Sequence, residues 1–250
     1  MRANRLREIW ASGKAANNAW LAIPSIFSAE MMAQQGWDSL TVDMQHGQAD
    51  YSALIQMLVA ISTGPSVPLV RVPYNNPGDV MRALDAGVYG VICPNVDTVE
   101  QCRQFVSACR YPPLGTRSLG PHRATIYGGA DYVAKANETI LAIVQIESKI
   151  ALQNVDAIAK VEGLDMLYIG PSDLAFSLGR TPRLDSDDPV TVQAMDEILA
   201  AAKRAGLKSG IYCATVEYAK RMAAKGFDLV TVVNDQALIG AGARLVKEFR

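Results

Sequence analysis

Side chains that could move a proton are concentrated in TVDMQHGQAD, residues 41–50. The stretch begins like a buried β-strand, and then Asp43, Gln45 and His46 follow closely. An imidazole titrates near neutral pH, and a nearby carboxylate can orient it and raise its basicity. A lone histidine is often structural, but the place of His46 beside Asp43 and Gly47 at a strand end favours acid–base catalysis.

Carboxylates follow two later apolar runs of the chain. In ILAIVQIE, Gln145 and Glu147 are two residues apart and share one face of the strand, which we expect to be the inner face. Asp173 follows the run LDMLYIG and starts a helical pattern. Two carboxylates at the ends of neighbouring strands would bind one hard divalent cation, Mg²⁺ or Mn²⁺, with water and substrate as further ligands.

More ordinary roles exist for the same two acids. Glu147 could form a salt bridge with Arg71 or Lys149, because a buried carboxylate is costly without a partner. Asp173 could be a first-turn acid that the helix dipole stabilises. The expected proximity of the two carboxylates favours the metal site.

Arg71 lies between valines in VPLVRV, where a guanidinium needs an anionic partner. It could be a counter-ion for Glu147, but its planar fork also suits a carboxylate or oxyanion of a ligand, and we favour the ligand. No lysine lies in the interior of a predicted strand, since Lys149 and Lys208 come closest and lie at strand edges, and this disfavours a Schiff-base mechanism.

Eight short β-rich runs alternate with helical patterns along the chain. The runs are residues 19–23, 39–43, 67–72, 89–93, 140–147, 164–170, 208–213 and 227–233. They are continuous apolar runs, typical of strands buried on both faces, and glycines often follow the helical patterns. This alternation predicts a single (β/α)8 barrel over residues 1–250. A doubly wound open sheet, the alternative, usually has a glycine-rich turn after its first strand, and AIPSIFSAE has no glycine.

A barrel would position the reactive residues at one rim, because its catalytic groups stand at the carboxyl ends of the strands. The long Pro/Gly-rich segment 111–132 is expected to be a loop over this active site.

The composition excludes several other classes of protein. A net charge of −1 with 20% charged residues provides no basic field for nucleic acid. No apolar run approaches the roughly 20 residues that cross a bilayer, and no secretory signal is recognisable. The four cysteines lack zinc-binding spacing and are expected to be reduced thiols of a cytoplasmic protein: Cys93, Cys102, Cys109 and Cys213.

Several motifs together resemble one family. DMQHG, the arginine of VPLVRV, LDAGVYGVICP, YPPLGTRS, QIES and GPSDLAFSLG occur in this order. They are similar to the class II pyruvate aldolases of the HpcH/HpaI family, which include the 4-hydroxy-2-oxoheptanedioate and 2-dehydro-3-deoxy-galactarate aldolases. The likeness runs from about residue 19 to the C-terminus. It implies cleavage of 4-hydroxy-2-oxo acids to pyruvate, or hydroxypyruvate, and an aldehyde through a metal-stabilised enolate.

The resemblance also implies a role for each site residue. Glu147 and Asp173 would bind Mg²⁺, Mn²⁺ or Co²⁺, and Arg71 would contact the keto or enolate oxygen. His46 would be the acid–base group, supported by Asp43. The substrate site would be completed by Gln145, Gly170, Pro171 and Ser172.

Assembly is part of the resemblance as well. Asp85 in LDAG would reach the active site of a neighbouring subunit in a hexamer built as a trimer of dimers. The final helical pattern, 237–249, would be exchanged between subunits. One departure concerns the acceptor aldehyde: many members have Glu-His where this chain has Gln45-His46.

Two other functions stay open on the sequence. A related decarboxylase or carbon–carbon lyase acting on oxaloacetate-like acids would use the same metal site. A non-catalytic metabolite-binding barrel would keep the fold, although the intact set of reactive residues argues against it.

Overall fold

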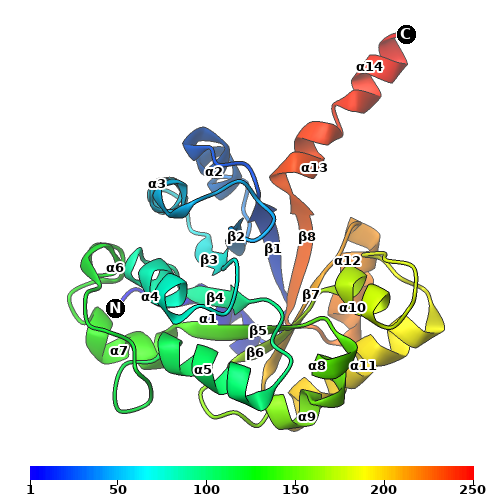
Figure 1. The fold of residues 1–250 in the computed structure, drawn as a ribbon. Helices are drawn as coiled ribbons and strands as arrows, with labels where there is room; N and C mark the ends of the chain where they lie inside the picture. Colours follow the sequence, from blue (N-terminus) through cyan, green and yellow to red (C-terminus); the bar gives the residue numbers. More distant parts are fainter.

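The barrel predicted from the sequence is confirmed. The computed structural model describes residues 1–250, and eight parallel strands close in the order β1 to β8 (Figure 1). The strands are β1 (Ala16–Leu21), β2 (Ser39–Asp43), β3 (Val67–Arg71), β4 (Gly90–Cys93), β5 (Leu141–Ile146), β6 (Met166–Ile169), β7 (Lys208–Tyr212) and β8 (Leu229–Asn234). Every residue of β2 to β6 is buried, as the continuous apolar runs predicted.

Helices surround the barrel (Figure 1). Those after β1 to β4 are α2 (Ile26–Ala33), α3 (Tyr51–Ile61), α4 (Pro77–Asp85) and α5 (Val99–Cys109). Those after β5 to β8 are α8 (Lys149–Gln153), α9 (Val155–Ile158), α10 (Pro171–Ser177), α11 (Pro189–Arg204), α12 (Val216–Lys225), α13 (Asp235–Gly240) and α14 (Ala243–Phe249). Ser25, Asp50, Asn76 and Thr98 accept hydrogen bonds from first-turn N–H groups of α2 to α5, which fixes where these helices begin.

Three helices were not expected from the sequence. α1 (Arg5–Ala11) precedes the barrel, and α6 (His122–Gly128) and α7 (Tyr132–Thr139) lie between α5 and β5. α6 therefore occupies part of the segment 111–132, which we expected to be a loop. Because this segment leads into the amino end of β5, it lies at the end of its own barrel that is opposite to the carboxyl ends of the strands. Its role at an active site stays a prediction that requires a neighbouring subunit.

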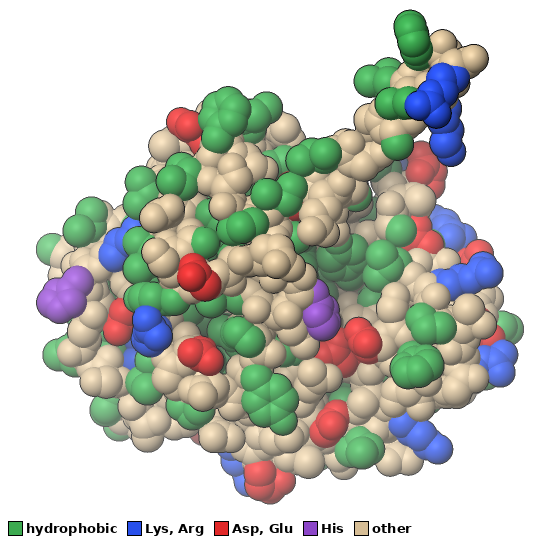
Figure 2. All heavy atoms as spheres, turned by 45° about the horizontal axis from the view of Figure 1, so that its top comes forward, with side chains coloured by type: hydrophobic (Ala, Val, Ile, Leu, Met, Phe, Trp, Pro, Cys, Tyr) green, Lys and Arg blue, Asp and Glu red, His purple; other side chains and the backbone are tan.

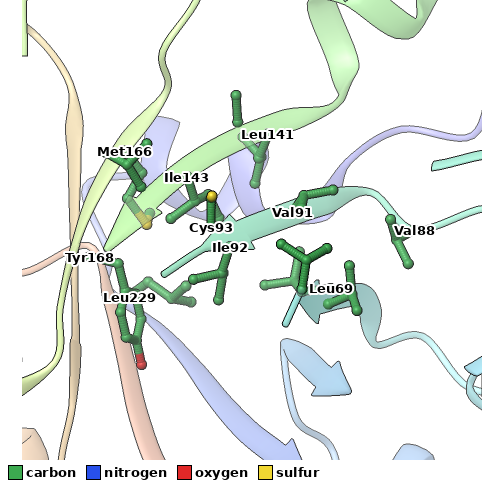
Figure 3. Packing of buried hydrophobic residues seen from close by; sticks show 14 of the residues in the cluster. Leu69, Val88, Val91, Ile92, Cys93, Leu141, Ile143, Met166, Tyr168 and Leu229 are labelled. Carbon is green, nitrogen blue, oxygen red and sulfur yellow. The ribbon is translucent and has the colours of Figure 1, made fainter. Parts of the chain in front are cut away.

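Apolar side chains fill the interior of the barrel. Leu69, Leu141, Ile143 and Leu229, from β3, β5 and β8, are fully buried and pack together (Figure 3). Gly90 in β4 makes room for them, because a Cβ there would lie 2.8 Å from Cδ2 of Leu69 and 3.1 Å from Cβ of Leu141. The barrel is thus a packed core, and a substrate can approach only from its ends.

A buried polar layer lies nearer the carboxyl ends of the strands. Thr231 Oγ1 accepts hydrogen bonds from Asn18 Nδ2 at 2.9 Å and from Trp20 Nε1 at 3.1 Å. It also lies 2.5 Å from the hydroxyl of Tyr168. Because two donors occupy its lone pairs, the Thr231 hydroxyl donates its proton to the Tyr168 oxygen. This layer fixes the indole of Trp20.

The last two helices leave the barrel. α13 and α14 project from the end of β8, and no residue of α14 is buried (Figure 1). Apolar side chains of this arm are exposed: Leu238, Ile239, Leu245, Val246 and Phe249. An unpacked apolar helix suits the predicted exchange between subunits, which stays a prediction. No helix of the structure combines the length and the apolar character that a membrane span requires.

Replacing Thr231 tests the buried polar layer. Thr231→Val preserves shape but leaves the N–H groups of Asn18 and Trp20 without their acceptor, so we expect the free energy of unfolding to fall by about 2–4 kcal/mol. Thr41→Val is the matched control, because Thr41 is equally buried and donates one hydrogen bond to Asn18 Oδ1. That loss should cost about 1 kcal/mol. Urea unfolding measures both variants, and equal losses would contradict the role of Thr231.

Candidate active site

One pocket opens at the carboxyl ends of the strands. All the residues that the sequence assigned to catalysis or substrate binding line it, except Asp85. Of the two predicted metal ligands, Asp173 lines the pocket and Glu147 does not. In Figure 2 a histidine and neighbouring acidic side chains border a hollow on this face. The fold therefore brings together side chains from the ends of β2, β3, β5 and β6, as the barrel prediction required.

An ion pair between β2 and β3 forms the wall of this pocket. Asp43 and Arg71 are direct partners in the strand register. Arg71 Nε donates to Asp43 Oδ1 at 2.8 Å and Nη2 donates to Oδ2 at 2.7 Å, and both side chains are buried. The protein counter-ion of Arg71 is therefore Asp43, and not Glu147, which the sequence had suggested as one possibility. The pair leaves Nη1 of Arg71 without a hydrogen bond to the protein.

Trp20 holds the same guanidinium from another side. The centroid of its ring lies 4.3 Å from Cζ of Arg71, and an aromatic face attracts a cation. Tyr212 packs edge-on against Trp20, with the ring centroids 5.1 Å apart. Arg71 is therefore fixed by an acid and an aromatic ring before any ligand arrives.

Six residues that line the pocket were not predicted from the sequence. They are Trp20, Ala22, Leu184, Tyr212, Asn234 and Gln236. Aromatic residues within apolar strands usually belong to the hydrophobic core, so the sequence offered no reason to place Trp20 and Tyr212 at the pocket. Asn234 and Gln236 lie where β8 ends, and this position at the rim was the available signal.

His46 is exposed at the pocket on the loop after β2. We expected Asp43 to orient its imidazole, and the structure corrects this. Asp43 Oδ1 accepts from the backbone N–H groups of Gln45 at 3.1 Å and His46 at 3.4 Å, and both carboxylate oxygens also accept from Arg71. No hydrogen bond joins Asp43 to the imidazole of His46. Gly47 allows the loop to close tightly, since a Cβ there would lie 2.1 Å from the carbonyl oxygen of Asp43. Asp43 thus positions the backbone of His46, not its ring.

Glu147 lies just beyond β5 and is buried next to Gln145, as the two-residue spacing predicted. A Cβ at Gly170 would lie 2.5 Å from Glu147 Oε2 and 2.6 Å from Gln145 Nε2, so any other residue there would displace the ends of these two side chains. Glu147 forms no salt bridge with Arg71 or Lys149. Its hydrogen bond comes from the backbone N–H of Asn95, which donates to Oε1 at 2.8 Å.

The oxygens in this corner fit a hard divalent cation. Oε1 of Gln145 is buried without a hydrogen-bond partner, and Oε2 of Glu147 faces Gly170. Asp173, in the first turn of α10, adds a second carboxylate. Mg²⁺ and Mn²⁺ bind such oxygen ligands together with water. No group of three His, Cys, Asp or Glu side chains gathers here, so water and substrate would supply the remaining ligands.

Without a cation, the charged form of the Glu147 carboxyl is disfavoured. Burial raises its pKa to about 7, and the hydrogen bond from Asn95 opposes this effect. The negative charge of Asp173 raises the pKa further. A positive ion beside the two carboxylates would reverse this shift.

Asp85 does not reach this pocket. It ends α4, and because barrel helices run opposite to the strands, it lies at the other end of its own barrel. Its Oδ1 accepts a hydrogen bond from Nη2 of the buried Arg117 at 2.8 Å. Its expected role in the active site of a neighbouring subunit stays a prediction.

The raised pKa of Glu147 predicts how the metal-free protein responds to pH. The folded state binds the proton more tightly than the unfolded chain, so stability falls as pH rises from about 4.5 through about 7. Glu147→Gln removes this loss, and we expect it to stabilise the metal-free protein at pH 8 by at most about 3 kcal/mol, and hardly at pH 5.

Urea unfolding in EDTA at the two pH values measures this difference. Glu162→Gln, at an exposed glutamate, is the matched control and should follow the wild type. A Glu147→Gln variant with the pH dependence of the wild type would show that the buried carboxylate has no such effect.

Known proteins are similar to this chain in both sequence and fold. Residues 19–239 match the family described as HpcH/HpaI aldolase/citrate lyase. The chain is 40% identical to a hydroxypyruvate/pyruvate aldolase of Rhizorhabdus wittichii over 97% of each protein. It is 37% identical to a 5-keto-4-deoxy-D-glucarate aldolase of Escherichia fergusonii, over 99% of this chain and 97% of that one.

A solved structure gives the same result. The crystal structure of an HpcH/HpaI aldolase/citrate lyase family protein from Burkholderia cenocepacia superposes with a TM-score of 0.90 at 33% identity, covering 99% of both chains. Since the match extends over nearly the whole barrel and its rim, the resemblance seen in the motifs is confirmed, and the chain belongs to the HpcH/HpaI aldolase/citrate lyase family of carbon–carbon lyases.

Proposed function

We propose that the protein reversibly cleaves 4-hydroxy-2-oxo acids to pyruvate, or hydroxypyruvate, and an aldehyde. The observation that carries this proposal is the fixed guanidinium of Arg71, which shares one pocket with His46 and Asp173. The buried Glu147 lies behind this pocket, close enough to Asp173 for the charge of one carboxylate to affect the other. The names of the relatives, a hydroxypyruvate/pyruvate aldolase and a 5-keto-4-deoxy-D-glucarate aldolase, support this class of substrate.

Arg71 is placed to stabilise the charge that cleavage creates. When the bond between C3 and C4 of the substrate breaks, its electrons move toward the keto group and negative charge develops on the keto oxygen. Arg71 lines the pocket, its Nη1 has no hydrogen bond to the protein, and a fixed positive donor stabilises such an oxyanion without reorganisation.

His46 is the proton carrier in this scheme. Cleavage removes the proton of the 4-hydroxyl group as the aldehyde forms, and C3 of the enolate later gains a proton to give pyruvate. His46 lies exposed at the pocket, and its loop backbone is held by Asp43. An imidazole suits a proton that must be accepted and returned near neutral pH.

The carboxylate corner completes the site. A divalent cation, Mg²⁺, Mn²⁺ or Co²⁺, held by Glu147 and Asp173 supplies Lewis acidity toward the oxygens of the 2-oxo acid. Gln145 and the backbone from Gly170 to Ser172 position the substrate carboxylate, because they line the same wall of the pocket.

The assembly is part of the proposal. We propose a hexamer, a trimer of dimers, in which Asp85 completes a neighbour's pocket and α14 packs on another subunit. The exposed apolar arm supports this arrangement. A cytoplasmic location is consistent with four free, buried cysteines.

Metal-dependent release of pyruvate tests the function. The protein is stripped with EDTA, reloaded with Mg²⁺, Mn²⁺ or Co²⁺, and assayed on a panel of 4-hydroxy-2-oxo acids with lactate dehydrogenase as the coupling enzyme. We expect pyruvate only from the reloaded protein. Pyruvate from none of the acids with any of the ions would refute the proposal. Release of CO2 from oxaloacetate without aldol cleavage would instead establish the related decarboxylase.

His46→Ala tests the proton carrier. The variant should keep its fold and its metal affinity, because the Asp43 contact is to the backbone, and lose about 10²–10⁴-fold in turnover. Lys160→Ala is the control, since Lys160 lies exposed after α9, outside both the pocket and the segment 111–132. Unchanged cleavage by His46→Ala would remove this residue from the mechanism.

A further inference from the structure

One residue outside the glycines adopts the left-handed backbone conformation. Asn95 has a φ of 53°, and no other non-glycine residue in the chain has a positive φ. Asn95 follows β4 by two positions, so it lies on the rim of the barrel that carries the pocket. L-residues avoid this conformation, and asparagine tolerates it better than most. Strain of this kind persists only where the surrounding structure maintains it.

The strained residue contacts the proposed cation site through its backbone. The N–H of Asn95 donates to Oε1 of Glu147 at 2.8 Å. The side chain of Asn95 is exposed and forms no hydrogen bond, so the contact depends on the backbone conformation alone. A return to the ordinary right-handed or extended region would turn this N–H away from the carboxylate.

The loop that contains Asn95 is tied to the segment after Glu147. Asp97 accepts a hydrogen bond from the hydroxyl of Ser148, and its carbonyl oxygen accepts one from Asn154 Nδ2 at 2.8 Å. Both links are made by Asp97, two residues after Asn95, and they hold the β4–α5 loop against the residues that flank α8, Ser148 before it and Asn154 after it.

The two oxygens of Glu147 therefore have different surroundings. Oε1 is held by the N–H of Asn95, whereas Oε2 faces Gly170, where any Cβ would lie within 2.5 Å of it. The N–H of Asn95 thus fixes the orientation of the carboxylate through Oε1, while Oε2 has no hydrogen bond to the protein and stays available as a metal ligand.

We propose that Asn95 is a positioning residue for the cation site, whose left-handed backbone holds Oε1 of Glu147 and leaves Oε2 for the metal. This inference rests on the metal site of the proposed function. It predicts that the identity of residue 95 acts through the backbone: residues that accept the left-handed conformation keep the site, and β-branched residues lose it.

Mn²⁺ affinity, measured by isothermal titration calorimetry on the full chain, tests the inference. Asn95→Gly should bind Mn²⁺ about as tightly as the wild type. Asn95→Val should raise the Kd about tenfold, because the loop leaves the left-handed conformation and the competent population falls. Asn95→Ala should lie between them and serves if the valine variant does not fold.

Gly13→Ala separates positioning from simple strain. Gly13 also has a positive φ, 77°, but lies in an open turn with no atom within 4 Å of an added Cβ. This variant should lower the Tm in EDTA while leaving the Kd for Mn²⁺ unchanged.

Other outcomes would overturn the inference. An Asn95→Val variant with a lowered Tm and an unchanged Kd would make Asn95 a structural residue only. Equal losses of affinity in Asn95→Gly and Asn95→Val would assign the effect to the side chain. A wild-type protein that binds no Mn²⁺ overturns the inference together with the metal site, whereas Mn²⁺ binding without pyruvate release overturns only the proposed reaction.

Discussion

Glu147 stands at the end of β5 with 4% of its surface exposed, and a charged carboxylate in such a place requires a compensating partner. The structure supplies one N–H group from Asn95 and no basic side chain. Arg71, the basic residue within the same pocket, is already paired with Asp43. The corner therefore suits an added positive charge, because Arg71 affects Glu147 only from a distance and forms no salt bridge with it.

The Asp43–Arg71 pair explains why the strand ends are so polar. Its members are opposite each other in the register of β2 and β3, so the barrel itself aligns the bidentate contact. The same carboxylate holds the backbone of His46, and Trp20 covers the guanidinium while its indole N–H is anchored at Thr231. One chain of contacts thus runs from the buried polar layer to His46, the proposed proton carrier, and it restricts motion where the proposed reaction would develop charge.

The eight strands and most of the pocket could be predicted from the sequence, because alternating apolar runs and polar strand ends are local signals. Gln145 and Glu147 share a face since strands have a period of two. The partner of Asp43 could not be predicted, because it depends on register between strands. The role of Asn95 was missed because a positive φ cannot be read from the sequence. Trp20 was missed because an aromatic residue in an apolar strand usually belongs to the hydrophobic core. Asp85 meets its proposed partner only in another subunit.

The central claim is that one divalent cation binds between Glu147 and Asp173 at the carboxyl end of the barrel. Anomalous diffraction at the manganese edge, from crystals grown with Mn²⁺ and pyruvate, tests it most directly. The account predicts one strong peak per chain, bonded to Oε2 of Glu147 and to the carboxylate of Asp173, with pyruvate oxygens beside it and Nη1 of Arg71 near the keto oxygen. A peak bonded to other residues, or no peak in this pocket, would contradict it.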